Sequence, residues 1–191
     1  RLVKEVLNSR PIGIFGDYDV DGATSAALIA NYLEHCGCET FIHIPDRFLE
    51  GYGPNEKALK GLHEKGAELI ITVDCGISSF EPLKAMNFVN LDLIVIDHHI
   101  PDITLPPAYA IINPKRIDSR NGFEDLCAAG VTFIFLIGLN RELRNKGFFK
   151  DKKEPNLINF LDLVALGTVC DVVPLSGLNR AFVNPYLSFM K

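Results

Sequence analysis

Residues 91–99 read Leu91-Asp-Leu-Ile-Val-Ile-Asp-His-His99, an apolar run that ends on an acid and two imidazoles. The run from Leu91 to Ile96 predicts a buried strand, although it contains one acid, Asp92. Burying its polar end without partners would cost several kcal/mol, so the strand is expected to present these three groups at its edge. Other segments of the fold must therefore supply the groups that Asp97, His98 and His99 contact.

Other apolar segments alternate with helical segments along the chain. Besides residues 91–96, strands are expected at residues 11–16, 39–44, 68–73 and 108–112. Helices are expected at residues 1–10, 23–36, 55–65, 77–86, 126–145 and 157–166, with a further one from Gly177. This alternation predicts an α/β fold, a mainly parallel five-stranded sheet with helices on both faces and a helical C-terminal part.

Composition favours a soluble globular protein. Of 191 residues, 48% are hydrophobic and 23% are charged, which suits one domain, or one lobe of a longer protein, and argues against disorder. No apolar run reaches the ~18 residues of a membrane helix, and the N-terminus does not resemble a signal peptide, so no membrane contact is expected. Five cysteines without a CxxC pair predict reduced core thiols in a cytoplasmic protein: Cys36, Cys38, Cys75, Cys127 and Cys170.

Acids also follow the first and third predicted strands. Asp17, Asp19 and Asp21 come after the first strand, and Asp74 comes after the third. The carboxyl ends of parallel strands share one edge, where ligands bind. If residues 17–21 are extended, alternate carboxylates share a face, and a pair ~5 Å apart repels by roughly 3 kcal/mol. Such acids need cations, unless they form a solvated loop or only cap the next helices.

The two histidines and a late acid complete the candidate set. If strand geometry persists, His98 and His99 point to opposite sides and differ in role, one binding a metal and the other reaching substrate or a hydrogen-bond partner. Asp171, flanked by apolar residues, is expected to be either buried and paired or a ligand. Several carboxylates and one imidazole suit two Mn²⁺ or Mg²⁺ ions better than structural zinc. Two ions ~3.5–4 Å apart, bridged by a carboxylate, promote in-line displacement at phosphorus.

Four segments, taken in order, resemble the motifs of the DHH phosphoesterase superfamily: Asp17-Tyr-Asp-Val-Asp-Gly-Ala-Thr-Ser25, Val73-Asp-Cys-Gly76, Ile96-Asp-His-His99 and Gly167-Thr-Val-Cys-Asp-Val-Val-Pro-Leu175. Within it, they are similar to the RecJ branch of single-strand-specific 5′-to-3′ DNA exonucleases, as are the loop Ile44–Gly53 and the run Cys127–Val131. Relatives that cleave short oligonucleotides usually begin the first motif with a histidine and an Asn-Pro-Asp segment. This chain has Asp17-Tyr-Asp19 there, which favours the RecJ branch.

The resemblance implies a Rossmann-like DHH catalytic domain. It also implies a metal-dependent exonuclease that acts on single-stranded DNA in repair and recombination and releases 5′-mononucleotides by two-metal hydrolysis. The implied ligands of Mn²⁺ or Mg²⁺ are Asp19, Asp21, Asp74, His98 and Asp171, with Asp74 as the bridge. Asp17 is implied as a catalytic-site residue, either a further ligand or an acid that supports the ligands. His99 is implied as a catalytic contact of the scissile phosphate, and Asp97 as the residue that orients a histidine.

The resemblance also implies a longer protein. RecJ enzymes carry a second family domain and an oligonucleotide-binding fold after the catalytic lobe, and residues 1–191 resemble that lobe only, so a fragment is expected. The formal charge of −5 suits a nucleic-acid binder poorly, but the acids gather at the metal site and the DNA-gripping surface would lie elsewhere. Basic residues within 141–153 are either a remnant of that surface or a solvated helix end.

Single-stranded DNA is the implied partner, together with a single-strand-binding protein or a helicase; the residues that bind substrate are not identified. Three alternatives stay open. A nanoRNA or cyclic-dinucleotide phosphodiesterase would cleave only dinucleotides, and a silent replication scaffold would not bind Mn²⁺. A receiver-like phosphoacceptor would use Asp17 to Asp21 but would leave both histidines and Asp171 unexplained.

Overall fold

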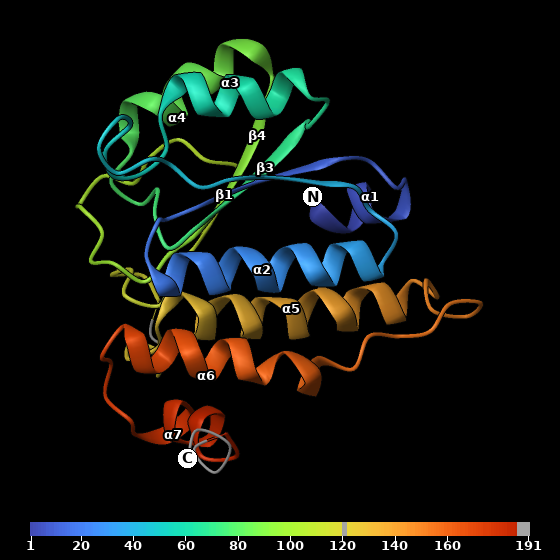
Figure 1. The fold of residues 1–191 in the computed structure, drawn as a ribbon. Coiled ribbons are helices and arrows are strands. Elements are labelled where there is room, and N and C mark those ends of the chain that lie inside the picture. Colours follow the sequence, from blue (N-terminus) through green and yellow to red (C-terminus); the bar gives the residue numbers. More distant parts are fainter. Residues whose placement is uncertain (120–121, 187–191) are drawn as a thin grey trace.

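A five-stranded sheet forms the middle layer of the fold in the computed structural model, which describes residues 1–119 and 122–186 (Figure 1). The strands are β1 (Ile12–Gly16), β2 (Thr40–His43), β3 (Leu69–Val73), β4 (Asp92–Ile96) and β5 (Ala110–Ile112). Their order is β2-β1-β3-β4-β5, and every neighbouring pair is parallel. The predicted five-stranded parallel sheet is therefore confirmed.

Helices cover both faces of this sheet (Figure 1). One face carries α1 (Leu2–Leu7), α2 (Val20–His35) and α5 (Ala128–Asn145), with α6 (Leu161–Cys170) and α7 (Gly177–Val183) packed outside them. The other face carries α3 (Glu56–Glu64), α4 (Phe80–Met86) and the short 3₁₀ turn η1 (Asn87–Val89). A second 3₁₀ turn, η2 (Leu157–Phe160), leads into α6.

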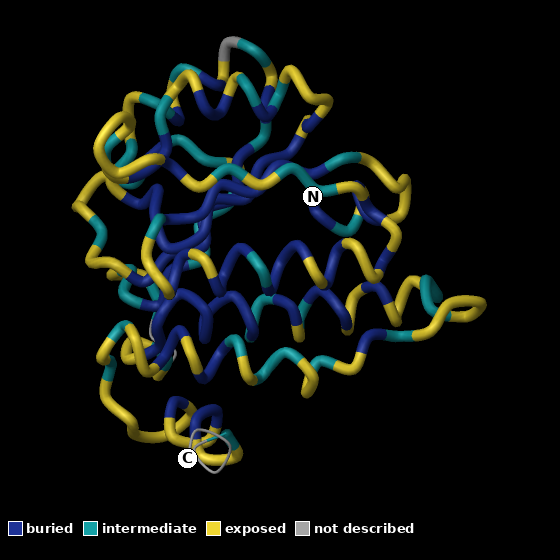
Figure 2. The backbone as a smooth tube through the Cα atoms, in the orientation of Figure 1, coloured by how far each residue is buried: buried dark blue, intermediate teal, exposed yellow. Residues whose placement is uncertain are grey.

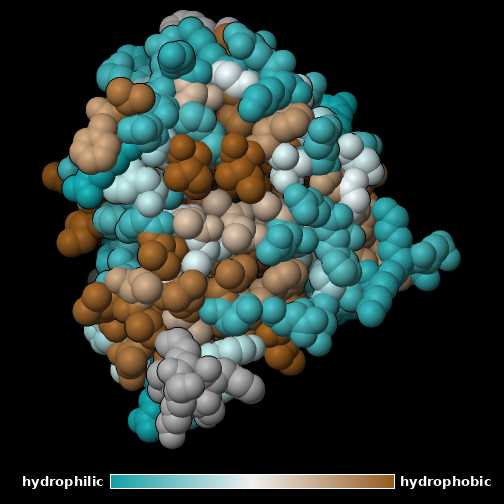
Figure 3. All heavy atoms as spheres, in the orientation of Figure 1, coloured by the Kyte–Doolittle hydropathy of each residue, from teal (hydrophilic) through white to brown (hydrophobic). Residues whose placement is uncertain are grey.

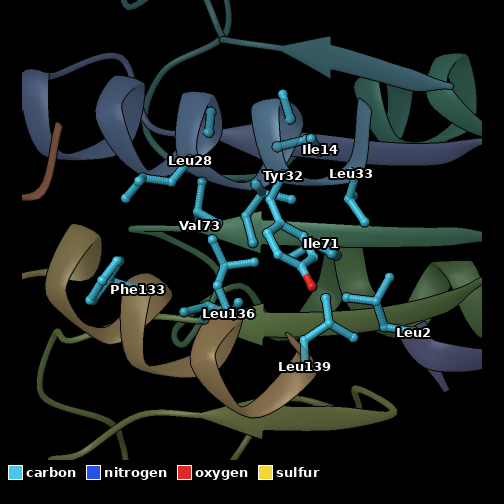
Figure 4. Close-up of a cluster of buried hydrophobic side chains, with 14 of the residues drawn as sticks. Leu2, Ile14, Leu28, Tyr32, Leu33, Ile71, Val73, Phe133, Leu136 and Leu139 are labelled. Carbon is cyan, nitrogen blue, oxygen red and sulfur yellow. The ribbon is translucent and has the colours of Figure 1, made fainter. Parts of the chain in front are cut away.

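The two faces divide the core into two clusters. Ile14 of β1 and Ile71 of β3 point toward α2 and α5, whereas Phe15 and Ile70, one residue along, point toward α3 and α4. This alternation follows from the two-residue period of a strand, and it explains why the strands are apolar on both sides. Figure 4 shows the larger cluster, and Figure 2 shows that the inner strands β1, β3 and β4 and the facing turns of α2 and α5 are mostly buried.

Several helix boundaries differ from the sequence prediction, and those of α2, α4 and α6 have clear local features. The helix expected from residue 23 begins at Val20, because Asp19 caps it by accepting a hydrogen bond from the Gly22 amide. The helix expected at residues 77–86 begins only at Phe80, and Ser79 makes no side-chain cap bond there. The helix expected to end at residue 166 continues to Cys170, so Gly167 lies inside it.

Gly167 lies where α2, α5 and α6 pack most closely. A Cβ atom on Gly167 would lie 2.7 Å from Thr24 Oγ1, and 2.8 Å from both Ala129 Cβ and Asp21 Oδ1. No larger residue fits without moving a helix, since real Cβ atoms do not approach other atoms so closely. This contact fixes the C-terminal end of α6 against the N-terminal ends of α2 and α5, at the carboxyl edge of the sheet (Figure 1).

The outer face of α6 is apolar. Figure 3 shows hydrophobic side chains gathered over this helix and the segment after it, and the exposed ones include Leu166, Val169, Val172 and Leu175. Cys170 is exposed too, so the prediction of core thiols holds for Cys36, Cys38, Cys75 and Cys127 but is wrong for Cys170; all five thiols are free. Within residues 1–119 and 122–186, no helix is both long and apolar enough to span a bilayer.

Candidate metal centre

The first acidic segment turns directly from β1 into α2. Asp17 is buried at the end of β1, where its Oδ1 accepts a 2.8 Å hydrogen bond from the Tyr18 amide. Asp19 caps α2, and Asp21 lies in the first helical turn. Residues 17–21 are therefore not extended throughout, and the condition under which alternate carboxylates would share one face is not met. Gly22 allows the tight turn, since a Cβ there would lie 2.6 Å from the carbonyl oxygen of Asp17.

Asp21 is held by the N-terminus of α5. Its Oδ2 accepts a 2.6 Å hydrogen bond from the Ala128 amide, and its Oδ1 accepts one of 2.9 Å from the Ala129 amide. These are amides that a helix leaves without internal partners, and they favour a negative charge. Burial nevertheless raises the pKa of Asp21 to about 6, even though the two amides counteract it. Both donors are backbone groups, so side-chain patterns could not have indicated them.

Asp74 follows β3 in a strained backbone conformation. Its φ is +61°, in the left-handed region that non-glycine residues rarely adopt. Its side chain is buried, and Oδ1 has no hydrogen-bond partner among the described residues. Burial, together with the nearby carboxylates of Asp21 and Asp19, raises the pKa of Asp74 well above its ordinary range. A carboxyl group in this state lacks a positive partner.

Asp97 organises the chain after β4. Its Oδ1 accepts hydrogen bonds from the backbone amides of His98 (2.7 Å) and His99 (3.1 Å), and it lies 2.8 Å from His99 Nδ1. Its Oδ2 accepts a bond from the Ile77 amide at 3.1 Å. Burial alone would raise the pKa of Asp97, but the bonds from His99 and Ile77 outweigh it and lower that pKa. These contacts fit the orienting role that the family resemblance implies for Asp97, which stays a prediction.

The two histidines lie side by side. The prediction that they point to opposite sides is wrong, because the strand ends at Ile96 and Asp97 folds the chain into a turn that leaves the ring centroids 4.7 Å apart. They differ in exposure instead: the His98 side chain is 7% exposed and that of His99 47%. Burial lowers the pKa of His98 to about 4, whereas the hydrogen bond to Asp97 raises the pKa of His99.

His98 lies at the centre of the acids. Its Nε2 lies 3.3 Å from Asp74 Oδ1, 3.7 Å from Asp171 Oδ2 and 3.9 Å from Asp21 Oδ2. Within the described chain this nitrogen has no hydrogen-bond partner, although it is buried. Asp171 is the C-cap of α6, and burial followed by the charge of Asp19 raises its pKa.

These side chains fall into groups whose ligand atoms lie within 4.8 Å of one another. Two groups share no residue: Asp17, Asp19 and Asp74 form one, and Asp21, His98 and Asp171 form the other. A third group, Asp74, His98 and His99, links them. Oxygen donors with one imidazole suit Mn²⁺ or Mg²⁺, and two cations would supply the partners that Asp74 Oδ1 and His98 Nε2 lack. All the predicted site residues therefore lie in one place, and the donor set fits two divalent ions.

Tyr52 is a neighbour of this centre that the sequence did not single out. Its hydroxyl lies 3.3 Å from the carbonyl oxygen of Asp74, to which it donates, and 3.4 Å from His99 Nδ1. Its ring packs edge-on against His99, with centroids 6.0 Å apart, and against Tyr18, with centroids 6.5 Å apart. Tyr52 comes from the long loop after β2, and its position could have been suspected only from the family-like sequence of that loop.

The basic run at residues 141–153 lies away from the centre. It begins in the last turns of α5, whose N-terminus holds Asp21, and an 18-residue helix is ~27 Å long. Arg144 in this run is paired with Glu154. This position favours the interpretation as a solvated helix end over a remnant of a DNA-binding groove (Figure 1).

Comparison with known proteins supports the interpretation of the motifs. Residues 11–168 match the model of the DHH family, N-terminal domain. The single-stranded-DNA-specific exonuclease RecJ of Escherichia coli (strain K12) is 44% identical over 170 residues, which are 87% of this chain and 30% of that relative. The chain therefore spans less than a third of that curated relative.

Solved structures agree in fold. A crystal structure of exonuclease RecJ bound to manganese superposes with a TM-score of 0.82 at 34% identity, covering 98% of this chain and 46% of that one. The crystal structure of RecJ from Thermus thermophilus in complex with Mn²⁺ gives a TM-score of 0.77 at 31% identity, covering 98% of this chain and 26% of that one.

Proposed function

The chain belongs to the DHH family, and from this premise we propose that it is a metal-dependent phosphodiesterase, the catalytic part of a 5′-to-3′ exonuclease that acts on single-stranded DNA in repair and recombination. One observation carries the proposal. Two residue groups that share no member, each suited to a divalent cation, lie together at the carboxyl edge of the sheet with His99 beside them. The similarity to RecJ exonucleases supports the substrate class.

The metal ligands would divide as the two groups do. Asp17, Asp19 and Asp74 would hold one Mn²⁺ or Mg²⁺ ion, and Asp21, His98 and Asp171 the other. The third group supports Asp74 as the residue that joins the two sites, since its carboxylate also approaches His98 and His99. When bound, the two ions would lower the pKa of an attacking water and offset the charge that develops on the phosphate.

The remaining side chains would bind and orient the phosphodiester. His99 has Nδ1 engaged by Asp97 and is half exposed, so its Nε2 is available to a phosphate oxygen. The raised pKa of His99 favours the imidazolium, which attracts that oxygen as a charged donor. Asp97 would hold the ring in place without touching the substrate. Tyr52 would help to hold the ring, because its hydroxyl approaches the same Nδ1 and donates to the carbonyl oxygen of Asp74.

A nuclease assay tests this function. The chain and the intact gene product would be incubated with Mn²⁺ and 5′-labelled single-stranded, duplex and dinucleotide substrates. We expect 5′-mononucleotides from long single strands. We also expect loss of at least ~100-fold in rate for Asp74→Asn, because Asp74 would hold the cations whose positive charge at the phosphate is worth that much or more. Asp151→Asn, an exposed acid in the connector after α5, is the matched control and should cleave normally.

Cleavage of dinucleotides alone would contradict the proposal and favour the small-substrate phosphodiesterases. Calorimetry that detects no Mn²⁺ binding would favour a silent scaffold instead. We also propose that the chain is the catalytic domain of a longer protein; its 30% coverage of the E. coli relative and the apolar surface over α6 support this. A cytoplasmic location and a single-strand-binding protein or helicase as partner fit the function, and co-purification from cells would test both.

A further inference from the structure

The loop between β2 and α3 exposes two large apolar side chains. Phe48 is 94% exposed and Leu49 is 86% exposed. Burying a side chain of this size is favourable, so two neighbouring ones held in water leave that stabilisation unused. Adjacent exposed apolar side chains are more informative than scattered single ones, because together they offer a contact surface.

Hydrogen bonds fix the backbone of this loop, and the fixed backbone keeps Phe48 and Leu49 exposed to solvent. Asp46 Oδ1 accepts hydrogen bonds from the amides of Phe48 (2.8 Å) and Leu49 (3.1 Å). Glu50 Oε1 accepts one from the Asp46 amide at 3.0 Å, and the Glu50 amide donates back to the Asp46 carbonyl at 2.8 Å. Glu50 Oε2 lies 2.9 Å from His43 Nε2 and 3.0 Å from Asn55 Nδ2, which ties the turn to β2 and to the cap of α3. A turn fixed in this way presents a preformed surface.

The same loop reaches the candidate metal centre. Tyr52 contacts His99 and the backbone of Asp74, and it follows Phe48 by four residues, which span at most ~14 Å of extended chain. Arg47, next to Phe48, places its guanidinium 5.4 Å from the centroid of the Tyr18 ring. The exposed pair therefore belongs to the same short stretch of loop as a residue that contacts the centre, and it lies next to a positively charged side chain.

We propose that Phe48 and Leu49 form a platform on which an unpaired nucleobase stacks while the strand lies in the metal centre. The inference rests on the proposed function and adds the substrate contact that it lacks. Single strands expose the faces of their bases, and such faces stack on aromatic side chains with little regard to sequence. The positive charge of Arg47 suits the phosphates next to that base. Double-stranded DNA offers no free base face at this position, so the platform favours unpaired strands.

The chain contains no tryptophan, which allows a direct test. Phe48→Trp places a single fluorophore on the platform, and Ile158→Trp places one on a 64% exposed residue of η2, at the end of α6 away from Asp171. Both variants would be titrated, in Mn²⁺, with a phosphorothioate oligothymidylate that resists cleavage and with an abasic strand of equal length. We expect saturable quenching for Phe48→Trp with the base-bearing strand only, and no change for Ile158→Trp.

The second test measures the affinity of the chain for the oligothymidylate and for the abasic strand. Phe48→Ala should weaken the binding of the oligothymidylate ~5- to 100-fold, the range typical for loss of one base-stacking contact, and should leave binding of the abasic strand unchanged. Its melting temperature should equal that of the unmodified chain, because the removed ring is 94% exposed. Ile158→Ala is the control.

Equal binding by Phe48→Ala and the unmodified chain, or equal quenching by the abasic strand, would overturn the platform while leaving the nuclease proposal intact. An intact gene product that binds no single strand and cleaves none would overturn both. Quenching by duplex as strong as by single strand would show contact without preference for unpaired bases, and would also count against the platform.

Discussion

Asp74 combines an unfavourable backbone conformation with an unfavourable burial of its carboxyl group. Its backbone is in the left-handed region at φ +61°, its carboxyl group is buried, and its Oδ1 has no hydrogen-bond partner among the described residues. Residues in rare backbone conformations cost ~1–3 kcal/mol and persist where the surrounding structure enforces them. The direction of its pKa shift follows, because without a cation the group is more stable as the neutral acid.

The raised pKa of Asp74 predicts a pH-dependent stability in the absence of metal. Unfolding lets the group ionise at its ordinary value, while the folded chain keeps the proton, so the free energy of unfolding should fall as pH rises above ~4. His98, with its pKa lowered to about 4, has the opposite effect up to its ordinary value of 6.5. Above pH 6.5 the acid dominates, with a slope of up to ~1.4 kcal/mol per pH unit.

Urea unfolding of the chain in a chelator at pH 6.5, 7.25 and 8 would measure this slope. Asp74→Asn should flatten it and should raise stability at pH 8, since the amide cannot ionise. Asp151→Asn is the control and should retain the slope. A slope that is the same in all three proteins would show that Asp74 already ionises in the folded, metal-free chain.

The packing of α6 sets the distance between Asp171 and His98. Asp171 reaches the centre from the C-terminus of α6, one turn after Gly167, where α6 meets Thr24, Ala129 and Asp21. Gly167→Ala should push α6 outward, destabilise the chain by ~1–3 kcal/mol and move Asp171 away from His98. Its affinity for Mn²⁺, measured by calorimetry at a temperature where the chain is folded, should fall at least tenfold.

Gly61→Ala in α3 is the matched control for this variant. Nothing lies within 4 Å of a Cβ atom at Gly61, so alanine there should stabilise the helix by ~0.5–1 kcal/mol and leave Mn²⁺ affinity unchanged. If Gly167→Ala were destabilised but bound Mn²⁺ normally, Asp171 would not depend on the packing of α6, and its role as a ligand would be in doubt.

Element type was more predictable than element boundaries. All five strands were predicted, and the inner ones, β1, β3 and β4, were the clearest, because mostly apolar runs suit a sheet that is covered on both faces. The start of α2 was missed because the cap at Asp19 depends on a local hydrogen bond that competes with a metal-binding interpretation of the same residue. The end of α6 was missed because Gly167 looked like a helix terminator, whereas it allows close packing inside the helix.

At the scale of the whole molecule, the site joins segments that are far apart in the sequence. The rule that ligands lie at the carboxyl edge of a parallel sheet was enough to group Asp17, Asp74 and His98. Asp171 could not be placed by that rule, since it follows a helix that lies outside α2 and α5. Its apolar flanks left it either a paired acid or a ligand, and the family motif favoured the ligand. The contacts of Asp21 with α5 and of Tyr52 with His99 depend on tertiary packing and left no pattern in the sequence.

Because the proposed ligands come from α2, from α6 and from the ends of β1, β3 and β4, bound cations should stabilise the whole fold. Saturation at 100 times the dissociation constant adds ~2.7 kcal/mol, which corresponds to a rise of roughly 5–10 °C in melting temperature for a chain of this size. The rise should increase with pH, since Asp74 and Asp21 must lose their protons to bind a metal. Thermal melts with Mn²⁺, and with a chelator, at pH 6.5 and pH 8 would measure both effects.

The Asp171→Asn variant distinguishes stabilisation by bound Mn²⁺ from a general effect of salt. Removing one of the crowded acids relieves repulsion, so the metal-free variant should melt at the same temperature as the unmodified chain or above it. Its rise with Mn²⁺ should shrink, because the cation would then bind only one of the two residue groups fully. An equal rise in both proteins would mean that α6 contributes nothing to metal binding, and that the ions link only the strands and α2.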